Sequence, residues 1–268
     1  MAMTHTAASL PLDRYPQLAL GGIRIDAIES AGVDDLLRPL LRRPGPHHVI
    51  TVNANYLRSA ASNPRLQQVI EDASLVVPDG MPLVWAMKLR GARVGRRITG
   101  HDLTESLIRL SVSEGISLFF LGAAPGVAAE AAARVRRRHP AVSIAGVYSP
   151  PESAYPFPAG ENERMISAIN TSAADAVLVA LGCPKQDLWL ADNKHALNAS
   201  LAVGVGCVLD VLAGGVSRAP GWVQSAGVEW LYRLYQEPRR LATRYARDAA
   251  FLSRVFVRGA LEASRPGR

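Results

Sequence analysis

Short apolar runs without polar alternation recur along the chain, and longer segments with helical periodicity separate them. Strands in a parallel sheet are buried on both faces, so they are apolar at every position. Regular alternation of such strands with helices predicts an α/β fold with helices on both faces of the sheet. The predicted strands are His47–Val52, Leu75–Pro78, Ser117–Leu121, Val142–Val147, Ala176–Leu181 and Ser200–Val205.

Helical patterns lie between these strands, which predicts a doubly wound, Rossmann-like, mostly parallel sheet. The chain divides into three predicted regions. Residues 1–16 are expected to be a disordered leader, residues 17–217 one α/β domain, and residues 218–268 a basic helical C-terminal appendage. The predicted helices are Leu57–Glu71, Met81–Arg90, Leu103–Glu114, Val127–Arg138, Glu161–Ser172 and Gln186–Leu197.

The composition is ordinary for a globular protein, with 49% hydrophobic and 20% charged residues. No apolar run reaches the ~18 residues that cross a bilayer, and the N-terminus lacks the basic start of a signal peptide. The two cysteines, Cys183 and Cys207, are too few for a disulfide framework. They fit a reducing cytosol, and each is expected to be a small core residue.

The net charge of +7 is concentrated at one end of the chain. Residues 218–268 contain ten arginines and four carboxylates, a difference of +6, so the first 217 residues are nearly neutral. A basic tail on a neutral body predicts an anionic partner: phosphate groups, acidic lipid or nucleic acid.

Within this tail, arginines recur on one face of a predicted helix. They are Arg240, Arg244, Arg247, Arg254 and Arg258. Apolar side chains occupy the neighbouring face: Leu241, Tyr245, Leu252, Val255 and Phe256. A basic amphipathic helix of this kind lies in a membrane interface. The alternative, which stays open, is a helix that packs its apolar face on the body and exposes its arginines to water.

Ligands of open parallel sheets bind where the carboxyl ends of the strands meet. Four such ends carry polar residues or glycines: Thr51–Asn55, Asp79–Gly80, Gly122–Gly126 and Gly182–Gln186. Asp79 follows an apolar strand directly, and Gly80 permits close approach of a substrate. Asp79 is therefore a candidate general base. An N-cap of the helix that follows is an equally good interpretation of this aspartate.

Several cofactor and metal patterns are missing. There is no GxGxxG and no P-loop, which disfavours a nicotinamide enzyme or a P-loop kinase. No Asp-x-Asp pair is present, and His47-His48 and His101-Asp102 lack the further ligands of a metal site. We expect neither a cofactor nor a metal, and arginines would have to neutralise any diphosphate that leaves.

Taken in order, these motifs resemble the WecG/TagA/CpsF glycosyltransferases, also called glycosyltransferase family 26, from about Leu18 to Phe256. The motifs that carry the resemblance are Thr51–Asn55, Pro78–Pro82, Arg97–Asp102, Leu181–Asp187, Gly204–Gly214, Arg218–Pro220, Glu229–Arg233 and Glu237–Arg240. Two positions depart from the family pattern: Asp187 stands where Glu is usual, and His101 where a small polar residue is common.

The resemblance implies an inverting transfer of a hexose or N-acetylhexosamine from a UDP-sugar to a polyprenyl-diphosphate-linked saccharide, in cell-surface or exopolysaccharide biosynthesis. It implies a cytoplasmic enzyme, peripheral on the anionic inner face of the cell membrane. Asp79 becomes the catalytic base and Thr51 a second catalytic residue, and the resemblance places Thr51 and Asn53 near the donor sugar. The substrate-binding residues that it implies are Asn53, Asn55, Arg97, Asp102, Gly122, Gln186, Asp210, Arg233, Arg239 and Arg240.

Other classes and the finer identity stay open at this stage. The basic tail alone would also suit a nucleic-acid-binding module, although its arginines adjoin an apolar, aromatic face, and we expect no nucleic acid. A Rossmann-type dehydrogenase is disfavoured by the missing glycine fingerprint. The Pro78–Pro82 segment is similar to members that assemble exopolysaccharide with a hexose donor. The donor and the question of a homo-oligomer are not decided.

Overall fold

The computed structural model describes residues 15–217, 219–221, 223 and 227–263. Most of the predicted leader, together with Arg218, lies outside the described residues, as do the side chains of Arg240 and Arg258. Within the described residues, no helix is long and apolar enough to span a bilayer.

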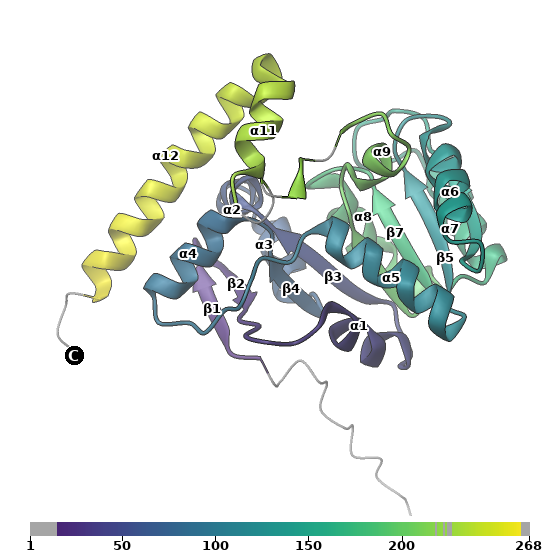
Figure 1. Ribbon diagram of the computed structural model, residues 1–268, viewed down its shortest axis with the longest axis horizontal. Helices are drawn as coiled ribbons and strands as arrows, with labels where there is room; N and C mark the ends of the chain where they lie inside the picture. Colours follow the sequence, from purple (N-terminus) through teal and green to yellow (C-terminus); the bar gives the residue numbers. More distant parts are fainter. Residues whose placement is uncertain (1–14, 218, 222, 224–226, 264–268) are drawn as a thin grey trace, which may run out of the picture.

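Six parallel strands form the central sheet in the order β4-β3-β8-β7-β5-β6 (Figure 1). The predicted α/β fold with a parallel sheet is confirmed, and most strand bounds agree to within a residue. The strands are β3 (His47–Val52), β4 (Leu75–Pro78), β5 (Ser117–Gly122), β6 (Ser143–Tyr148), β7 (Ala176–Ala180) and β8 (Leu201–Gly204).

Helices cover both faces of the sheet because successive strand residues point to opposite sides. Val49 lies in a core cluster on one face, and its neighbour Ile50 lies in a cluster on the other. The helices are α1 (Val33–Leu41), α2 (Ala54–Ala61), α3 (Pro64–Glu71), α4 (Met81–Leu89), α5 (Gly100–Glu114), α6 (Val127–Arg138), α7 (Ala159–Ser172), α8 (Lys185–Asn193), α9 (Val208–Leu212), α11 (Glu229–Gln236) and α12 (Pro238–Ala263).

Three features at the N-terminal side differ from the sequence prediction, and the first is helix α1, which was not predicted. An antiparallel hairpin of β1 (Gln17–Leu20) and β2 (Ile23–Asp26) precedes the sheet and was not predicted. The single predicted helix Leu57–Glu71 is two helices, α2 and α3. The break occurs because Asn63 caps α3 by accepting from Leu66 N at 3.1 Å, and Pro64 begins the new helix.

The C-terminal helices fold back along the body (Figure 1). Helix α12 buries Leu241, Leu252 and Val255, and the last two join the core cluster beneath α2 and α4. Arg58 of α2 donates to Asp248 of α12 over 2.6 Å. In the structure, α12 therefore packs its apolar face on the body, as the alternative interpretation of this helix required. A domain boundary at residue 217 stays a prediction.

The strand order creates a switch point between β5 and β7. The chain leaves β5 through α6 toward β6, whereas it leaves β7 through α8 toward β8 on the other side. Loops diverge at such a point and open a crevice at the carboxyl ends of the strands. Of the predicted site residues, Asn53 follows β3, Asp79 follows β4, and Gly122 ends β5 at this carboxyl edge.

Candidate active site

Asp79 lies at the carboxyl edge of the sheet. It follows β4 directly, and its N–H donates to the carbonyl of Val52 on β3 over 2.7 Å. The parallel register pairs Val52 with Pro78, so the ends of the two strands are level. This pairing brings Asp79 beside the Thr51–Asn53 segment, as the strand-end argument predicted.

The helix that follows does not use Asp79 as its N-cap. Gly80 is the N-cap residue of α4, with φ +146°, and no side chain caps this helix. A φ in this region favours glycine. Of the two interpretations of Asp79 from its sequence context, the structure does not show the capping role, which leaves the carboxylate available for chemistry.

Burial and the charged groups near Asp79 together set its protonation, and burial has the larger effect. Burial raises the pKa of Asp79 to about 6, while the positive charges of Arg233 and Arg97 act in the lowering direction. Glu229 and Asp102 add smaller raising contributions. A carboxyl with a pKa near 6 is ionised at neutral pH and is still a stronger base than an ordinary aspartate.

Helix α11 brings two charged side chains to this aspartate. Arg97 donates to Glu229 in the first turn of α11 over 2.6 Å, and both side chains are largely buried. One turn later, Arg233 Nη1 lies 3.6 Å from Cys207 Sγ, in the turn after β8. Cys207 is exposed, so its predicted place in the core is wrong. The Asp79 carboxylate is thus within electrostatic reach of one arginine from the body and one from α11.

The polar residues after β3 have local roles in the structure. Thr51 is buried on β3 beside Val77 of β4. The side chain of Asn53 accepts from Asn55 N and Tyr56 N and so caps α2. Asn55 accepts from Arg58 over 2.8 Å. These contacts place the three residues at the site edge, and the predicted roles of Thr51 in catalysis and of Asn53 and Asn55 in substrate binding stay predictions.

Gln186 belongs to a buried polar network that the sequence analysis missed. Its Nε2 donates to the hydroxyl of Tyr56 over 2.8 Å, and its Oε1 accepts from Gly206 N over 3.2 Å. Tyr56 in turn donates to Asp187, which lies 3.2 Å from Nε2 of His48. The network ties the first turn of α8 to α2, to the start of β3 and to the turn after β8. In the sequence, Tyr56 has only the pattern of a core aromatic residue.

The remaining predicted site residues are spread along the same edge. Asp102 forms a capping box with Thr99 at the start of α5. Gly122 has φ +106°, and a Cβ there would meet the carbonyl of Ala180 at 2.6 Å. Asp210 lies on α9, and its backbone carbonyl accepts from Gly215 N. Arg239 is exposed at the start of α12; Arg240 follows it, with a side chain outside the described part.

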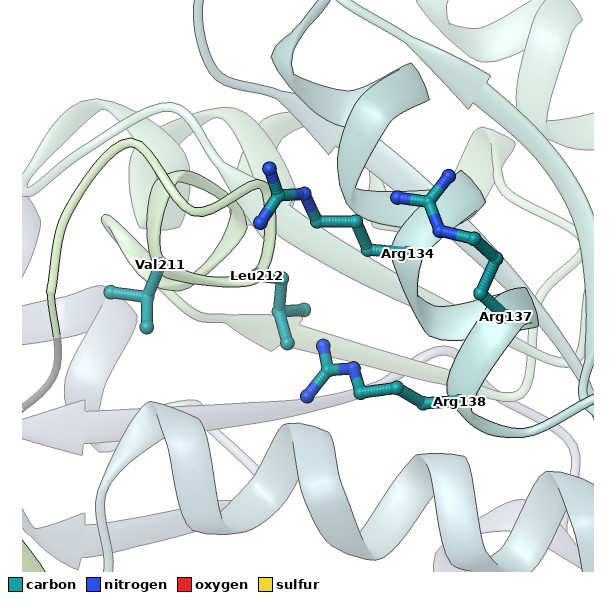
Figure 2. Close-up of a pocket in the computed structure, with 5 residues that line it drawn as sticks. All are labelled: Arg134, Arg137, Arg138, Val211 and Leu212. Atoms are coloured by element: carbon teal, nitrogen blue, oxygen red, sulfur yellow. The ribbon is translucent and has the colours of Figure 1, made fainter.

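A separate cavity of about 410 Å³ lies between α6 and α9 (Figure 2). Its lining residues are Arg134, Arg137, Arg138, Val211 and Leu212, none of them a predicted site residue. Arg134 and Arg137 share Glu130 as an ion-pair partner. Cations in the last turn of a helix also complement its dipole. Stabilisation of α6 therefore explains this arginine cluster without a bound ligand.

The fold and this edge define an α/β protein with a candidate general base between arginines, an arrangement suited to group transfer with an anionic leaving group. The chain matches the Glycosyl transferase WecG/TagA/CpsF family over residues 18–265 and belongs to that family. It is therefore a glycosyltransferase, as the sequence predicted.

One relative of known activity comes from Bacillus spizizenii. It is 36% identical over 192 residues, which cover 72% of each chain. That protein is an N-acetylglucosaminyldiphosphoundecaprenol N-acetyl-beta-D-mannosaminyltransferase.

Proposed function

We propose that the protein transfers a sugar from a UDP-sugar to a polyprenyl-diphosphate-linked saccharide, with inversion at the anomeric carbon. Membership of the family supports the glycosyl transfer. The name of the Bacillus relative supports a lipid-diphosphate acceptor and favours N-acetylmannosamine over a plain hexose as the transferred sugar. We place the reaction in the synthesis of a cell-surface polysaccharide.

The environment of Asp79 is the observation that carries this proposal. In a direct displacement, the acceptor hydroxyl oxygen bonds to the anomeric carbon as the bond from that carbon to the diphosphate oxygen breaks. Asp79 would take the hydroxyl proton, and UDP would leave with the bonding electrons. A single displacement of this kind reverses the anomeric configuration. The pKa near 6 suits a base that works at neutral pH.

Arginines supply the positive charge that this leaving group needs. Arg97 and Arg233 both act on the charge of Asp79, so a diphosphate beside the aspartate would meet the same two cations. Glu229 holds Arg97 over 2.6 Å and fixes the direction of its guanidinium. We propose that Arg239 and Arg240, at the start of α12, complete this cationic side of the site.

The acceptor lipid places the reaction at a membrane, and we propose the inner face of the cell membrane. Exposed arginines of α12, among them Arg247 and Arg254, support peripheral attachment to an anionic surface. Attachment would bring the site to the headgroup level, where a polyprenyl diphosphate presents its saccharide.

A transfer assay over a panel of donors tests the proposal. The purified protein is incubated with a polyprenyl-diphosphate-linked N-acetylglucosamine and with UDP-N-acetylmannosamine, its uronic acid or UDP-glucose. We expect UDP release and a disaccharide product with one UDP-sugar, and an anomeric configuration opposite to that of the donor. A product with retained configuration, or no product with any UDP-sugar, would contradict the proposal.

A further inference from the structure

The segment between Asp79 and Asp102 is unusually basic. Residues 80–101 contain five basic side chains and no carboxylate: Lys88, Arg90, Arg93, Arg96 and Arg97. The segment comprises α4 and the connection to α5, and it lies within the region whose total charge is close to zero. A local cationic surface is therefore present on the body itself, apart from the C-terminal helices.

Helix α4 exposes large apolar side chains beside these cations. Its inner face is buried in the core through Leu83, Val84 and Met87. On its outer face, Trp85 is 49% exposed and Leu89 is 77% exposed. Burying both would remove apolar area from water. Lys88 is exposed next to Leu89.

The outer face of α4 is continuous with α12. The guanidinium of Arg90 donates to the carbonyl of Ala19 over 2.9 Å and to that of Val255 over 3.4 Å. Arg90 therefore holds the end of α4 against the C-terminal half of α12. At that level of α12, Arg254 and Val257 are exposed, and Val257 is 59% exposed. Cations and apolar side chains thus continue from one helix to the other.

We propose that this α4 surface, formed by Trp85, Lys88, Leu89, Arg93 and Arg96, binds an anionic lipid bilayer as a second contact beside α12. Trp is enriched at the headgroup level of membranes, and cations near an anionic leaflet are attracted to it. This pairing of exposed apolar and basic side chains on a short helix suits an interface that is apolar inside and anionic at its surface. The inference rests on the proposed function for its biological setting.

The position of the surface links it to the site. Asp79 immediately precedes the segment, and Arg97 stands one residue after Arg96. The α4 surface therefore belongs to the segment that begins directly after the candidate base, and a bilayer bound to it would hold the protein in a fixed orientation. An acceptor embedded in that bilayer would reach the site without leaving the membrane.

Vesicle co-sedimentation with the full chain tests the proposal without donor or acceptor, so its failure is distinct from failure of the proposed reaction. The vesicles contain phosphatidylglycerol and phosphatidylcholine, or phosphatidylcholine alone. We expect Trp85→Ser/Leu89→Ser to weaken binding to the anionic vesicles about tenfold or more, since two anchors are lost. We expect Arg93→Glu/Arg96→Glu to weaken it similarly, and more at low salt than at high salt.

Matched controls come from other faces of the molecule. Val112→Ser removes another exposed apolar side chain, on α5, and Arg137→Glu/Arg138→Glu reverses two exposed cations on α6 (Figure 2). Both controls should bind vesicles like the unmodified chain. Circular dichroism and thermal unfolding check that every variant is folded.

Several results would overturn the proposal. It fails if Trp85→Ser/Leu89→Ser and the unmodified chain bind anionic vesicles equally well, or if the unmodified chain binds no vesicles. It also fails if the α6 control loses as much binding as the α4 variants, because any basic surface would then suffice. Loss of a dimer in light scattering, with vesicle binding unchanged, would assign the α4 surface to self-association instead.

Discussion

We propose Asp79 as the general base, and a carboxyl can act as a base only when it is ionised, so the pKa of Asp79 should set the acid limb of activity. With a pKa of about 6, kcat/KM should fall below about pH 6 and level off above it. An ordinary aspartate would keep its activity down to about pH 4. The measurement is a pH profile of UDP release at low donor concentration. An acid limb near pH 4 would contradict the assignment.

Two neighbours of Asp79 should move this limb in opposite directions. Arg233 lowers the pKa of Asp79, so Arg233→Gln should raise it and shift the limb to higher pH. Glu229 acts in the raising direction, so Glu229→Gln should shift the limb to lower pH. The two variants serve as controls for each other. Shifts of the same sign would show that another group governs the profile.

Sequence reasoning found Asp79 because its signal is local: an apolar strand, then a carboxylate, then glycine. The Gln186 network had no such signal. Tyr56 and Asp187 are 131 residues apart, and they meet only because β3 lies beside β8 in the sheet. Tyr56 fits an apolar helix face as well as any core residue does. Contacts of this kind depend on strand order, which periodicity alone does not give.

At the scale of single elements, Asn53 is the N-cap of α2 and a predicted donor contact. Asn53→Asp keeps the side-chain oxygen that accepts from Asn55 N and Tyr56 N, whereas Asn53→Ala removes it. We expect Asn53→Ala to lose about 1 kcal/mol of unfolding free energy and Asn53→Asp to lose little. Thermal or urea unfolding measures this difference. Equal losses for both variants would show that the cap contributes nothing.

The arginines of α11 and α12 should differ in function according to their position: those near Asp79 should affect turnover, and those far along α12 should affect membrane binding. Arg254 is exposed far along α12, so Arg254→Glu should weaken binding to anionic vesicles and leave turnover of a water-soluble acceptor unchanged. Arg233 lies beside Asp79, so Arg233→Glu should reduce turnover more than vesicle binding. Sedimentation and UDP release measure the two effects. Parallel losses in both variants would refute this division.

Local sequence patterns predict some boundaries of helices and strands and miss others. The strands of the central sheet were predicted well because each is a short, mostly apolar run with turn residues at both ends, whereas β1 and β2 lack such a run. The break between α2 and α3 depends on Asn63 and Pro64, which form the N-terminus of α3. It was missed because the apolar periodicity continues through these two residues. The packing of α12 on the body could not be chosen from the sequence, because an apolar helix face fits a core and a lipid surface equally well.

At the scale of the whole molecule, the nearly neutral total charge of the first 217 residues conceals a local basic surface. The basic segment after Asp79 disappears in the near-neutral total of the first 217 residues, since acidic residues elsewhere cancel it. Only the fold shows that Trp85 and Leu89 stand exposed beside these cations. The net charge of a long region therefore does not predict the charge of the surface that one of its helices exposes.

Dependence on metal is also a property of the whole protein. Among the residues that the structure describes, no three His, Cys, Asp or Glu side chains form a candidate metal site. Because Arg97 and Arg233 act electrostatically on Asp79 and could neutralise a leaving diphosphate, we expect turnover to survive EDTA. The assay is UDP release before and after chelation, with magnesium or manganese added back. Loss of activity that either ion restores would refute this prediction.

The central claim is that Asp79 removes a proton from the acceptor during glycosyl transfer. The measurement that tests it most directly is turnover of Asp79→Asn with the donor and lipid acceptor that the unmodified protein uses. We predict a folded variant that binds UDP normally and transfers sugar about 10² to 10⁴ times more slowly, the usual share of a general base. Turnover close to that of the unmodified protein in a folded Asp79→Asn variant would contradict the account.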